Sequence, residues 1–577
     1  MNDIRRTILW VIFGFSLVML WDQWQVYNGN KPTFFPGAVQ TAQAHKPLGA
    51  ASTADGVPTA TANVATQARI TGATPQNSST SGLPAVVREK VVAQTDVFKL
   101  TFDTEGGSLV QVELLKHADK ADKSRDVVLL DDSQNRVYVA QTGLISAAGG
   151  AALPTHKTVM TLMPGERTLA EGSQSLELRF ESPEVGGIKL AKTYTLTRGS
   201  YAVSVKHEVI NTGAAAVAPQ LYLQLVRDGN KPVGESSFYS TFTGPAVYTD
   251  AKKYQKVEFA NIEKGKVDIE KTATNGYVAM VQHYFASAWL LGDGIQRDLF
   301  MRKMDASDGT HGMATFAVGM ITPLQSIAPG ARQTVEARLF VGPQEEKLLE
   351  SLTPGLELVK DYGWLTILAK PLYWLLDKLH GLIGNWGWAI MSLVLLLKLA
   401  FYWLNAKAYA SMAKMKAVNP RITEMRERLK DNPQQMQQEM MRIYREEKVN
   451  PMGGCFPIMI QIPVFIALYW VLLSTVEMRN TPWMGWIHDL SSPDPFYILP
   501  IIMTLTTVLQ TSLNPAPPDP MQAKMMWFMP LAFSVMFFFF PSGLVLYWIT
   551  NNVLSIAQQW VINTRMGVPP KFHFPKF

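Results

Sequence analysis

The chain has 577 residues, a formal charge of +6 and a single cysteine, Cys455. One cysteine excludes an intramolecular disulfide and a paired-cysteine metal site, so a domain outside the cytoplasm must be held together by its core alone. The length exceeds that of one ordinary soluble domain, and apolar residues are concentrated in particular regions, which indicates several domains of different kinds.

An apolar run from Ile8 to Trp21 comes directly after Arg5 and Arg6 near the amino terminus. Signal peptides and membrane anchors share this arrangement, and the position of a cleavage site after the run distinguishes them. The small-residue pattern Ala42-Gln43-Ala44 lies about 20 residues beyond the run, whereas cleavage normally occurs close to its end. We therefore expect residues 1–22 to form an uncleaved transmembrane anchor whose two arginines stay in the cytoplasm.

The next segment, from Gln43 to about Pro84, consists mostly of Ala, Thr, Ser, Gly and Pro with almost no large apolar residues. Such a composition cannot bury enough surface to offset the entropy that ordering costs. We expect residues 23–90 to be a flexible periplasmic tether with no role beyond spacing.

Apolar and polar residues alternate between residues 91 and 345, which is typical of half-buried strands. The clearest apolar sets are Phe98, Leu100 and Phe102; Val110, Val112 and Leu114; Leu176, Leu178 and Phe180; Tyr201, Val203 and Val205; and Leu221, Leu223 and Leu225. Asn211-Thr212-Gly213 supplies turn chemistry between the last two sets. Many half-buried strands pack naturally as two sheets, so we expect an all-β periplasmic sandwich over residues 91–345.

The titratable residues of this region show neither ligand spacing nor a catalytic constellation. We expect His207 and the scattered Asp and Glu residues to lie on the solvated surface, because such residues are seldom buried. The whole chain also lacks a Gly-rich phosphate loop that ends in Lys-Ser or Lys-Thr. We predict no enzymatic activity, no cofactor and no metal site.

Helical spacing begins near Gly363. The recurring apolar residues are Trp364, Leu368, Leu372, Leu375, Leu376, Leu379 and Ile383, while Lys370, Asp377, Lys378 and His380 are polar. The pattern predicts an amphipathic helix within residues 360–384. The tryptophan content and the adjacent membrane segments favour a position on the membrane surface, and the alternative is an ordinary core helix of the soluble domain.

Five long apolar segments come next, and each approaches the ~20 residues that a helix needs to cross hydrocarbon. They are about Trp386 to Leu404, Phe456 to Val476, Phe496 to Leu513, Met525 to Phe540, and Gly543 to Ile562. Together with the anchor they predict a polytopic α-helical membrane protein with six spans, of which five form a core over residues 385–565.

The connection over residues 407–450 carries ten Lys and Arg residues against six acids, which places it in the cytoplasm. A turn near Lys430 and a helix start at Pro433 indicate a helical hairpin. Its arginines either face solvent or dock a ribosome or another partner, and these alternatives stay open; they are Arg421, Arg426, Arg428, Arg442 and Arg445. Both termini are then cytoplasmic, with residues 566–577 as a short tail.

Lys398 lies about 12 residues after Trp386, which corresponds to roughly 18 Å along a helix and hence to the middle of a membrane. An unpaired lysine there costs on the order of 2.5 to 3.5 kcal/mol, so we expect it to face a water-filled cavity. The alternative is that its long stem lets the ammonium reach the cytoplasmic interface. Polar residues such as Gln461 and Asn551 in other segments indicate a partly hydrated groove around it, whereas a single Ser or Thr is expected to bond between helices.

Several strings in the second half closely resemble the YidC family of Gram-negative bacteria. They are Ser411-Met412-Ala413-Lys414-Met415, Glu447 through Tyr469, Ile487 through Pro500, Asp519 through Pro530, and Phe540 through Asn552. Over the amino-terminal half the resemblance lies mainly in the layout of an anchor, a variable tether and a periplasmic domain, which in that family is a β-supersandwich.

The resemblance implies five core helices around a hydrophilic groove that is open to cytoplasm and lipid, closed toward the periplasm, and positively charged inside. Lys398 falls at the charged position, where many relatives carry Arg. Ile462, Phe465 and Tyr547 match the substrate-contacting surface, with plain helix packing as the alternative. With Gln461 and Asn551, these residues form the expected groove.

The implied function is that of an insertase and chaperone for nascent membrane proteins in the inner membrane, which works alone or with the Sec translocon. Membrane lipids and the ribosome are further expected partners, and DNA is not. A small-molecule transporter is the first alternative, although its expected internal repeat is absent. The second is a periplasmic binding or sugar-processing domain on an anchor, which the β-rich region permits.

Overall fold

The computed structural model describes residues 56–59, 88–120, 122–146, 150–232, 241–304, 312–430, 432–447, 456–514 and 520–565, together with residues 567 and 572. The expected anchor at residues 1–22, most of the tether and most of the carboxy-terminal tail lie outside the described residues.

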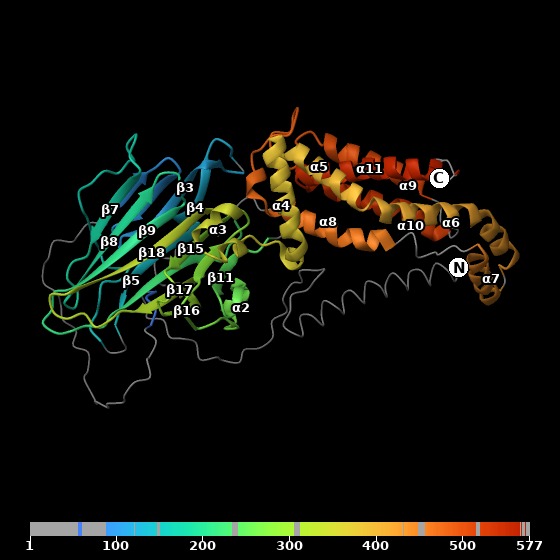
Figure 1. Ribbon diagram of the computed structural model, residues 1–577. Coiled ribbons are helices and arrows are strands. Elements are labelled where there is room, and N and C mark those ends of the chain that lie inside the picture. Colours follow the sequence, from blue (N-terminus) through green and yellow to red (C-terminus); the bar gives the residue numbers. More distant parts are fainter. Residues whose placement is uncertain are drawn as a thin grey trace. The chain divides into compact units, whose positions relative to one another are not determined.

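Two nine-stranded antiparallel sheets form the amino-terminal part (Figure 1). In spatial order the first sheet contains β1 (Lys90–Gln94), β2 (Phe98–Asp103), β3 (Ser108–Ala118), β4 (Asp126–Ser133), β5 (Arg136–Ile145), β10 (Gln220–Asp228), β17 (Thr315–Pro323), β16 (Arg297–Met304) and β13 (Thr272–Ala273). The second contains β12 (Lys253–Lys256), β11 (Gly244–Thr249), β14 (Tyr277–Val281), β15 (Phe285–Leu291), β18 (Arg332–Pro343), β9 (Ala202–Asn211), β8 (Ile188–Thr197), β7 (Ser175–Glu181) and β6 (Thr161–Leu162).

The core of the sandwich lies between the two sheets. The alternating apolar residues of β10, Leu221, Leu223 and Leu225, are all buried in one cluster with apolar residues of the second sheet. The indole Nε1 of buried Trp289, on β15, donates a 3.1 Å hydrogen bond to the carbonyl oxygen of Gln224 on β10. The prediction of an all-β sandwich is therefore confirmed.

The expected surface position of His207 is wrong. Its side chain is fully buried, and its Nε2 lies 3.0 Å from the Thr142 Oγ1. Lys192 is equally buried and donates 2.7 Å hydrogen bonds to the carbonyl oxygens of Gly106 and Thr142. Burial lowers the pKa of His207 to about 3 and that of Lys192 to about 7. Polar side chains enter this core because backbone and hydroxyl oxygens of the facing sheet bond to them.

Two short helices accompany the strands, α2 (Phe259–Glu263) and α3 (Glu346–Leu352). From residue 356 onward the described chain is mainly helical, apart from a long loop over residues 479–497. Its elements are η1 (Leu356–Val359), η2 (Gly363–Leu365), α4 (Thr366–Ile383), α5 (Trp386–Ala400), α6 (Tyr402–Arg428), α7 (Pro433–Glu446), α8 (Phe456–Ser474), η3 (Val476–Met478), α9 (Ile498–Leu513), α10 (Pro520–Met536), η4 (Phe537–Phe539) and α11 (Ser542–Arg565).

The first apolar segment of the expected core, residues 386–404, is not one helix. It breaks at Phe401, and α5 and α6 meet there at 65°. Among the described helices none alone is both long and apolar enough for a membrane span, although Trp386–Ala400 and Tyr402–Ser411 pass that test together. Shorter apolar helices are Gln461–Ser474, Ile498–Leu513 and Ala523–Phe539.

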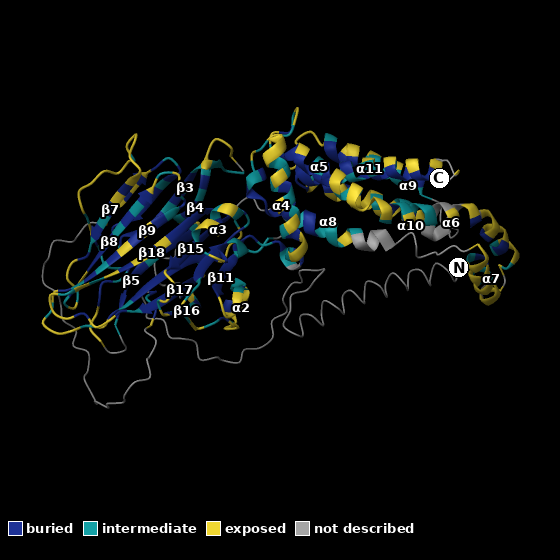
Figure 2. Cartoon of the chain, in the orientation of Figure 1, coloured by how far each residue is buried: buried dark blue, intermediate teal, exposed yellow. Residues whose placement is uncertain are grey.

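Exposed positions occur along several of these helices (Figure 2), and many of them carry large apolar side chains. On α4 the exposed fractions are 88% for Ile367, 61% for Trp374 and 85% for Leu382. Further exposed residues are Leu395, Leu396 and Leu399 on α5, Ile501 and Leu505 on α9, and Phe528, Phe533 and Val535 on α10. Exposed apolar surface on this scale is typical of contact with a membrane or another protein.

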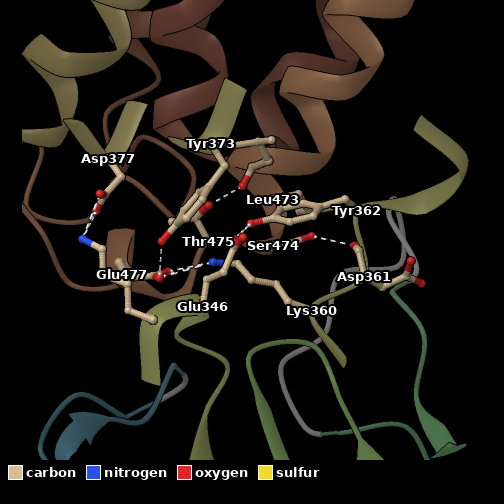
Figure 3. A network of polar contacts seen from close by, with 12 residues as sticks. Glu346, Lys360, Asp361, Tyr362, Tyr373, Asp377, Leu473, Ser474, Thr475 and Glu477 are labelled. Atoms are coloured by element: carbon tan, nitrogen blue, oxygen red, sulfur yellow. Dashed lines mark hydrogen bonds and ion pairs between the residues drawn. The ribbon is translucent and has the colours of Figure 1, made fainter. Parts of the chain in front are cut away.

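A polar network joins the segment after the sandwich to the helices (Figure 3). The side chain of Lys360 is fully buried, and its Nζ lies 3.2 Å from both carboxylate oxygens of Glu477. The Tyr373 hydroxyl donates a 2.6 Å hydrogen bond to the same carboxylate, and the Tyr362 hydroxyl donates to Glu346 at 2.6 Å. This junction, defined by those five residues, ties α3 and α4 to η3 at the end of α8.

Candidate functional site

Lys398 lies in the last turn of α5 and contacts α11. Its Nζ donates a 2.7 Å hydrogen bond to the Ser555 Oγ, and that hydroxyl donates to the carbonyl oxygen of Asn551 at 2.6 Å. The partner of the lysine is thus a neutral hydroxyl, so the hydrogen bond leaves the positive charge in place. The side chain is partly buried, as a charge at the edge of a cavity should be.

A small pocket of about 40 Å³ opens beside this lysine. Its lining residues are Val394, Leu397, Lys398, Phe401, Leu404, Asn405, Gln461, Val464, Tyr547 and Asn551. They come from α5, α6, α8, α11 and the bend at Phe401, so the break in the first apolar segment helps to form one wall. The volume has room for a few water molecules, and the amide and ammonium groups supply their hydrogen-bond partners.

Four of the six expected groove residues meet in this pocket: Lys398, Gln461, Tyr547 and Asn551. The Gln461 Nε2 donates a 3.0 Å hydrogen bond to the Asn551 Oδ1, which joins α8 to α11. This bond places two amide groups on one wall of the pocket, so the lining offers both hydrogen-bond donors and acceptors to a substrate.

The other two expected groove residues lie beside the pocket. The ring of Phe465 stacks on that of Tyr547 with centroids 5.8 Å apart, and it meets Trp548 edge-on at 4.7 Å. Ile462 has 49% of its surface exposed. Phe465 therefore supports a pocket wall through Tyr547, whereas Ile462 points outward from α8.

Sequence reasoning missed three polar residues of this region, namely Ser555, Gln558 and Asn405. The Asn405 Nδ2 donates a 3.3 Å hydrogen bond to the Gln558 Oε1, which joins α6, just after the bend, to α11. Ser555 and Gln558 come after Asn551 at helical spacings of four and seven, which places them on its face of α11. That spacing could have identified both residues as neighbours of Asn551 from the sequence alone.

Other polar residues of the core bond to the backbone of the helical turn that precedes them. The hydroxyls of Thr475, Thr504, Ser534 and Thr550 donate to carbonyl oxygens four residues earlier. For these four the expected bonds between helices are wrong, because the preceding turn offers a closer acceptor. Asn552 does bond between helices, since its Nδ2 donates to the Oγ1 atoms of Thr506 and Thr507.

The expected cytoplasmic hairpin consists of α6 and α7, and Pro433 opens α7. A small apolar cluster joins the two helices; its buried members are Val418, Ile422, Met425 and Ile443. Arg421 pairs with Glu446 and Glu447, and Arg442 pairs with Glu439 and Glu446. Arg428 and Arg445 are exposed and Arg426 is partly buried.

Two family models together match most of the chain. Residues 90–375 match the YidC periplasmic domain, and residues 378–568 match the 60Kd inner membrane protein family. The proteins named Membrane protein insertase YidC from Cupriavidus necator and Ralstonia nicotianae are 56% and 54% identical to this chain. The first match covers 98% of both chains and the second 99% of both.

Among solved structures, an active YidC insertase with its first transmembrane domain resolved covers 82% of this chain and 92% of its own. The identity between the two chains is 18% and the TM-score is 0.36.

Proposed function

This chain belongs to the YidC family of membrane protein insertases, and from that premise we propose that it inserts nascent membrane proteins into the inner membrane and helps them to fold. The observation that carries the proposal is the partly buried ammonium of Lys398, which lines a pocket that combines apolar side chains with a few polar groups. Such a charge favours a substrate segment that carries acidic groups, and the apolar surroundings favour a substrate that is finally inserted into lipid.

In the proposed mechanism, a short hydrophilic tail of the substrate enters the pocket region, drawn partly by Lys398. Its hydrophobic segment meanwhile moves along exposed apolar side chains such as Ile462 on α8 and Leu399 on α5. The polar groups of Gln461 and Asn551 replace water around the tail and so shorten its crossing of hydrocarbon. Release is driven by burial of roughly 20 apolar residues in lipid, with no nucleotide consumed.

We further propose six membrane spans: the anchor at residues 1–22 and five core helices, with both termini in the cytoplasm. Two helix lengths support this. α8 has 19 residues and α11 has 24, which at 1.5 Å per residue correspond to about 28 and 36 Å, close to the hydrocarbon thickness of a bilayer. Residues 407–450 are then the cytoplasmic hairpin, and the sandwich is periplasmic.

The amphipathic helix α4 fits a position on the periplasmic surface of the membrane. Ala369, Tyr373 and Leu376 face inward, while Ile367 and Leu382 are almost fully exposed. A helix with apolar groups on its outer side needs lipid or protein against it. Membrane lipids are therefore proposed partners of α4, and the Sec translocon and the ribosome are proposed partners in insertion.

Reconstituted vesicles test the proposal with two substrates that differ only in their tails, one acidic and one with the carboxylates changed to amides. Lys398→Met keeps the length of the side chain and removes its charge. We expect this variant to insert the acidic substrate about tenfold more slowly and the neutral one at nearly the native rate. Lys407→Met, near the start of the hairpin, is the matched control. Equal effects of Lys398→Met on both substrates would refute attraction by this charge.

A further inference from the structure

Four residues of the expected tether, 56–59, pack against the first sheet. Gly56 and Pro58 are buried, although this part of the chain has almost no large apolar residues. The φ angle of Gly56 is 68°, a left-handed conformation that favours glycine. Val57 precedes proline, which restricts it to an extended conformation. The segment is thus ordered locally, with a left-handed bend at Gly56 and a sequence that favours an extended conformation at Val57.

The segment lies on the outer face of the first sheet, defined as the face that points away from the second sheet. Leu223 of β10 points into the core between the sheets, so its neighbours Tyr222 and Gln224 point outward. The side chain of Val57 packs in an apolar cluster on this face; its other members are Ile145, Tyr222, Phe300 and Ile321. Four strands, β5, β10, β16 and β17, contribute to it.

Arg302 of β16 holds the backbone of the segment. Its Nη2 donates a 2.6 Å hydrogen bond to the carbonyl oxygen of Gly56, and its Nη1 donates to that of Val57 at 3.4 Å. Gln224 adds a longer bond of 3.5 Å to the Gly56 carbonyl, and Gln224 is itself held by Gln141 at 2.8 Å. The left-handed conformation of Gly56 bends the backbone so that two successive carbonyl groups face the same guanidinium. The contact therefore recognises this bent backbone and makes no bond to its side chains.

The same face continues beyond Gln141 into a pocket of about 90 Å³. Its lining is mainly charged and polar, with Asp103 and Lys157 among the residues, and Val139, Val226 and Met304 of the outer face form its apolar part. The surface that holds residues 56–59 is therefore longer than the segment that occupies it.

We propose that this outer face is a binding site for peptide segments with a glycine, a small apolar residue and a proline in that order, which the chain fills with its own residues 56–59. An unfolded segment of another polypeptide with the same three features replaces them. The tether holds the self-ligand at an effective concentration of about millimolar, so only a well-matched or abundant competitor displaces it. If the proposed function holds, the natural competitors are unfolded segments of insertase substrates that have reached the periplasmic side. Peptide binding is measured without insertion, so an experiment can contradict either proposal and leave the other intact.

The test uses the full chain in detergent micelles and a fluorescent peptide with the sequence of residues 51–62. In a vacated chain, alternating Gly and Ser replace residues 56–59. We expect the vacated chain to bind the peptide at least tenfold more tightly than the native chain, because its site has no internal competitor. Equal binding by the two chains would overturn the proposal.

Arg302→Lys in the vacated chain keeps the charge and loses the fork, so we expect at least tenfold weaker binding. Arg332→Lys, at an exposed position on β18 of the second sheet, is the matched control and should bind as the vacated chain does. If Arg302→Lys unfolds the sandwich, the same site is tested by a change in the peptide instead. A peptide with Val57→Asp should bind the vacated chain more weakly. Undiminished binding of that peptide would also contradict the proposal.

Discussion

The Nζ of Lys398 on α5 donates a 2.7 Å hydrogen bond to the Oγ of Ser555 on α11, a residue 157 positions later in the chain. A hydroxyl has one proton to donate, and Ser555 directs it to the carbonyl oxygen of Asn551. Its lone pairs are therefore the part that faces the lysine. This chain of bonds fixes the direction of the ammonium group without neutralising it.

Ser555→Ala should remove the acceptor and keep the charge. A net hydrogen bond is worth on the order of 1 kcal/mol, so we expect insertion of an acidic-tailed substrate to slow by about fivefold, less than for Lys398→Met. Ser534→Ala is the control, because Ser534 bonds only to a carbonyl of its own helix among the described contacts. A Ser555→Ala variant with native insertion kinetics would show that the bond does not position Lys398.

The junction around Glu477 should be sensitive to loss of either partner. Glu477→Gln removes the ion-pair partner of the fully buried ammonium of Lys360, and breaking a buried pair in this way typically costs about 3 to 5 kcal/mol. We expect faster proteolysis near residues 352–363 and a lower unfolding temperature.

The double variant Lys360→Met with Glu477→Gln should recover part of the loss, because neither side chain is then left charged. Asp377→Asn breaks the pair with Lys347, whose side chain is 74% exposed, and should cost less than about 1 kcal/mol. Similar losses from Asp377→Asn and Glu477→Gln would refute a special role for the buried pair.

Local patterns were enough to predict much of the fold. The alternation at Leu221, Leu223 and Leu225 indicated a strand with one face in a core, and turn residues before Pro433 indicated the start of a helix. The two sheets result from many such strands. These features depend on neighbours within a few positions, so a single sequence carries them.

Features that depend on distant partners were not predictable. His207 and Lys192 are buried because oxygens of Gly106 and Thr142 approach them from the other sheet. The turn at Asn211 joins β9 of the second sheet to β10 of the first, although its residues suit a hairpin equally well. The order of residues 56–59 likewise depends on Arg302, about 245 positions away. Contacts between residues so far apart in the sequence leave no local pattern from which they could be predicted.

Stability of the sandwich should fall below neutral pH. Burial lowers the pKa of His117 and His283 to about 4 and that of His156 and His207 to about 3, from an ordinary 6.5. As the pH falls from 6.5 toward 4, the unfolded chain binds protons that the folded chain does not, so stability is lost. Each histidine contributes a slope of up to about 1.4 kcal/mol per pH unit.

Urea unfolding at pH 7.5 and pH 5.0 measures this effect. His207→Asn removes one titrating group. The number of protons taken up on unfolding at pH 5.0 should therefore fall by nearly one, whatever the variant does to the free energy of unfolding at pH 7.5. Identical slopes for the native chain and His207→Asn would contradict the account of a buried neutral His207.

A side chain at Gly387 should destabilise the protein. A Cβ there would lie 2.2 Å from the Cδ1 of Trp483, whereas a Cβ at Gly381 on α4 meets nothing within 4 Å. We expect Gly387→Ala to displace the indole and lower the unfolding temperature by several degrees. Gly381→Ala should be neutral or stabilising by up to about 1 kcal/mol, because alanine favours a helix. An equal response to both changes would argue against close packing of Trp483 on α5.

The most direct test of the central claim is site-specific photocrosslinking from positions 398, 465 and 547 to stalled nascent membrane proteins of increasing length. The account predicts crosslinks from all three positions that appear only after a hydrophobic segment has emerged from the ribosome. Correctly folded protein that gives no crosslink at any length would contradict an insertase groove at Lys398.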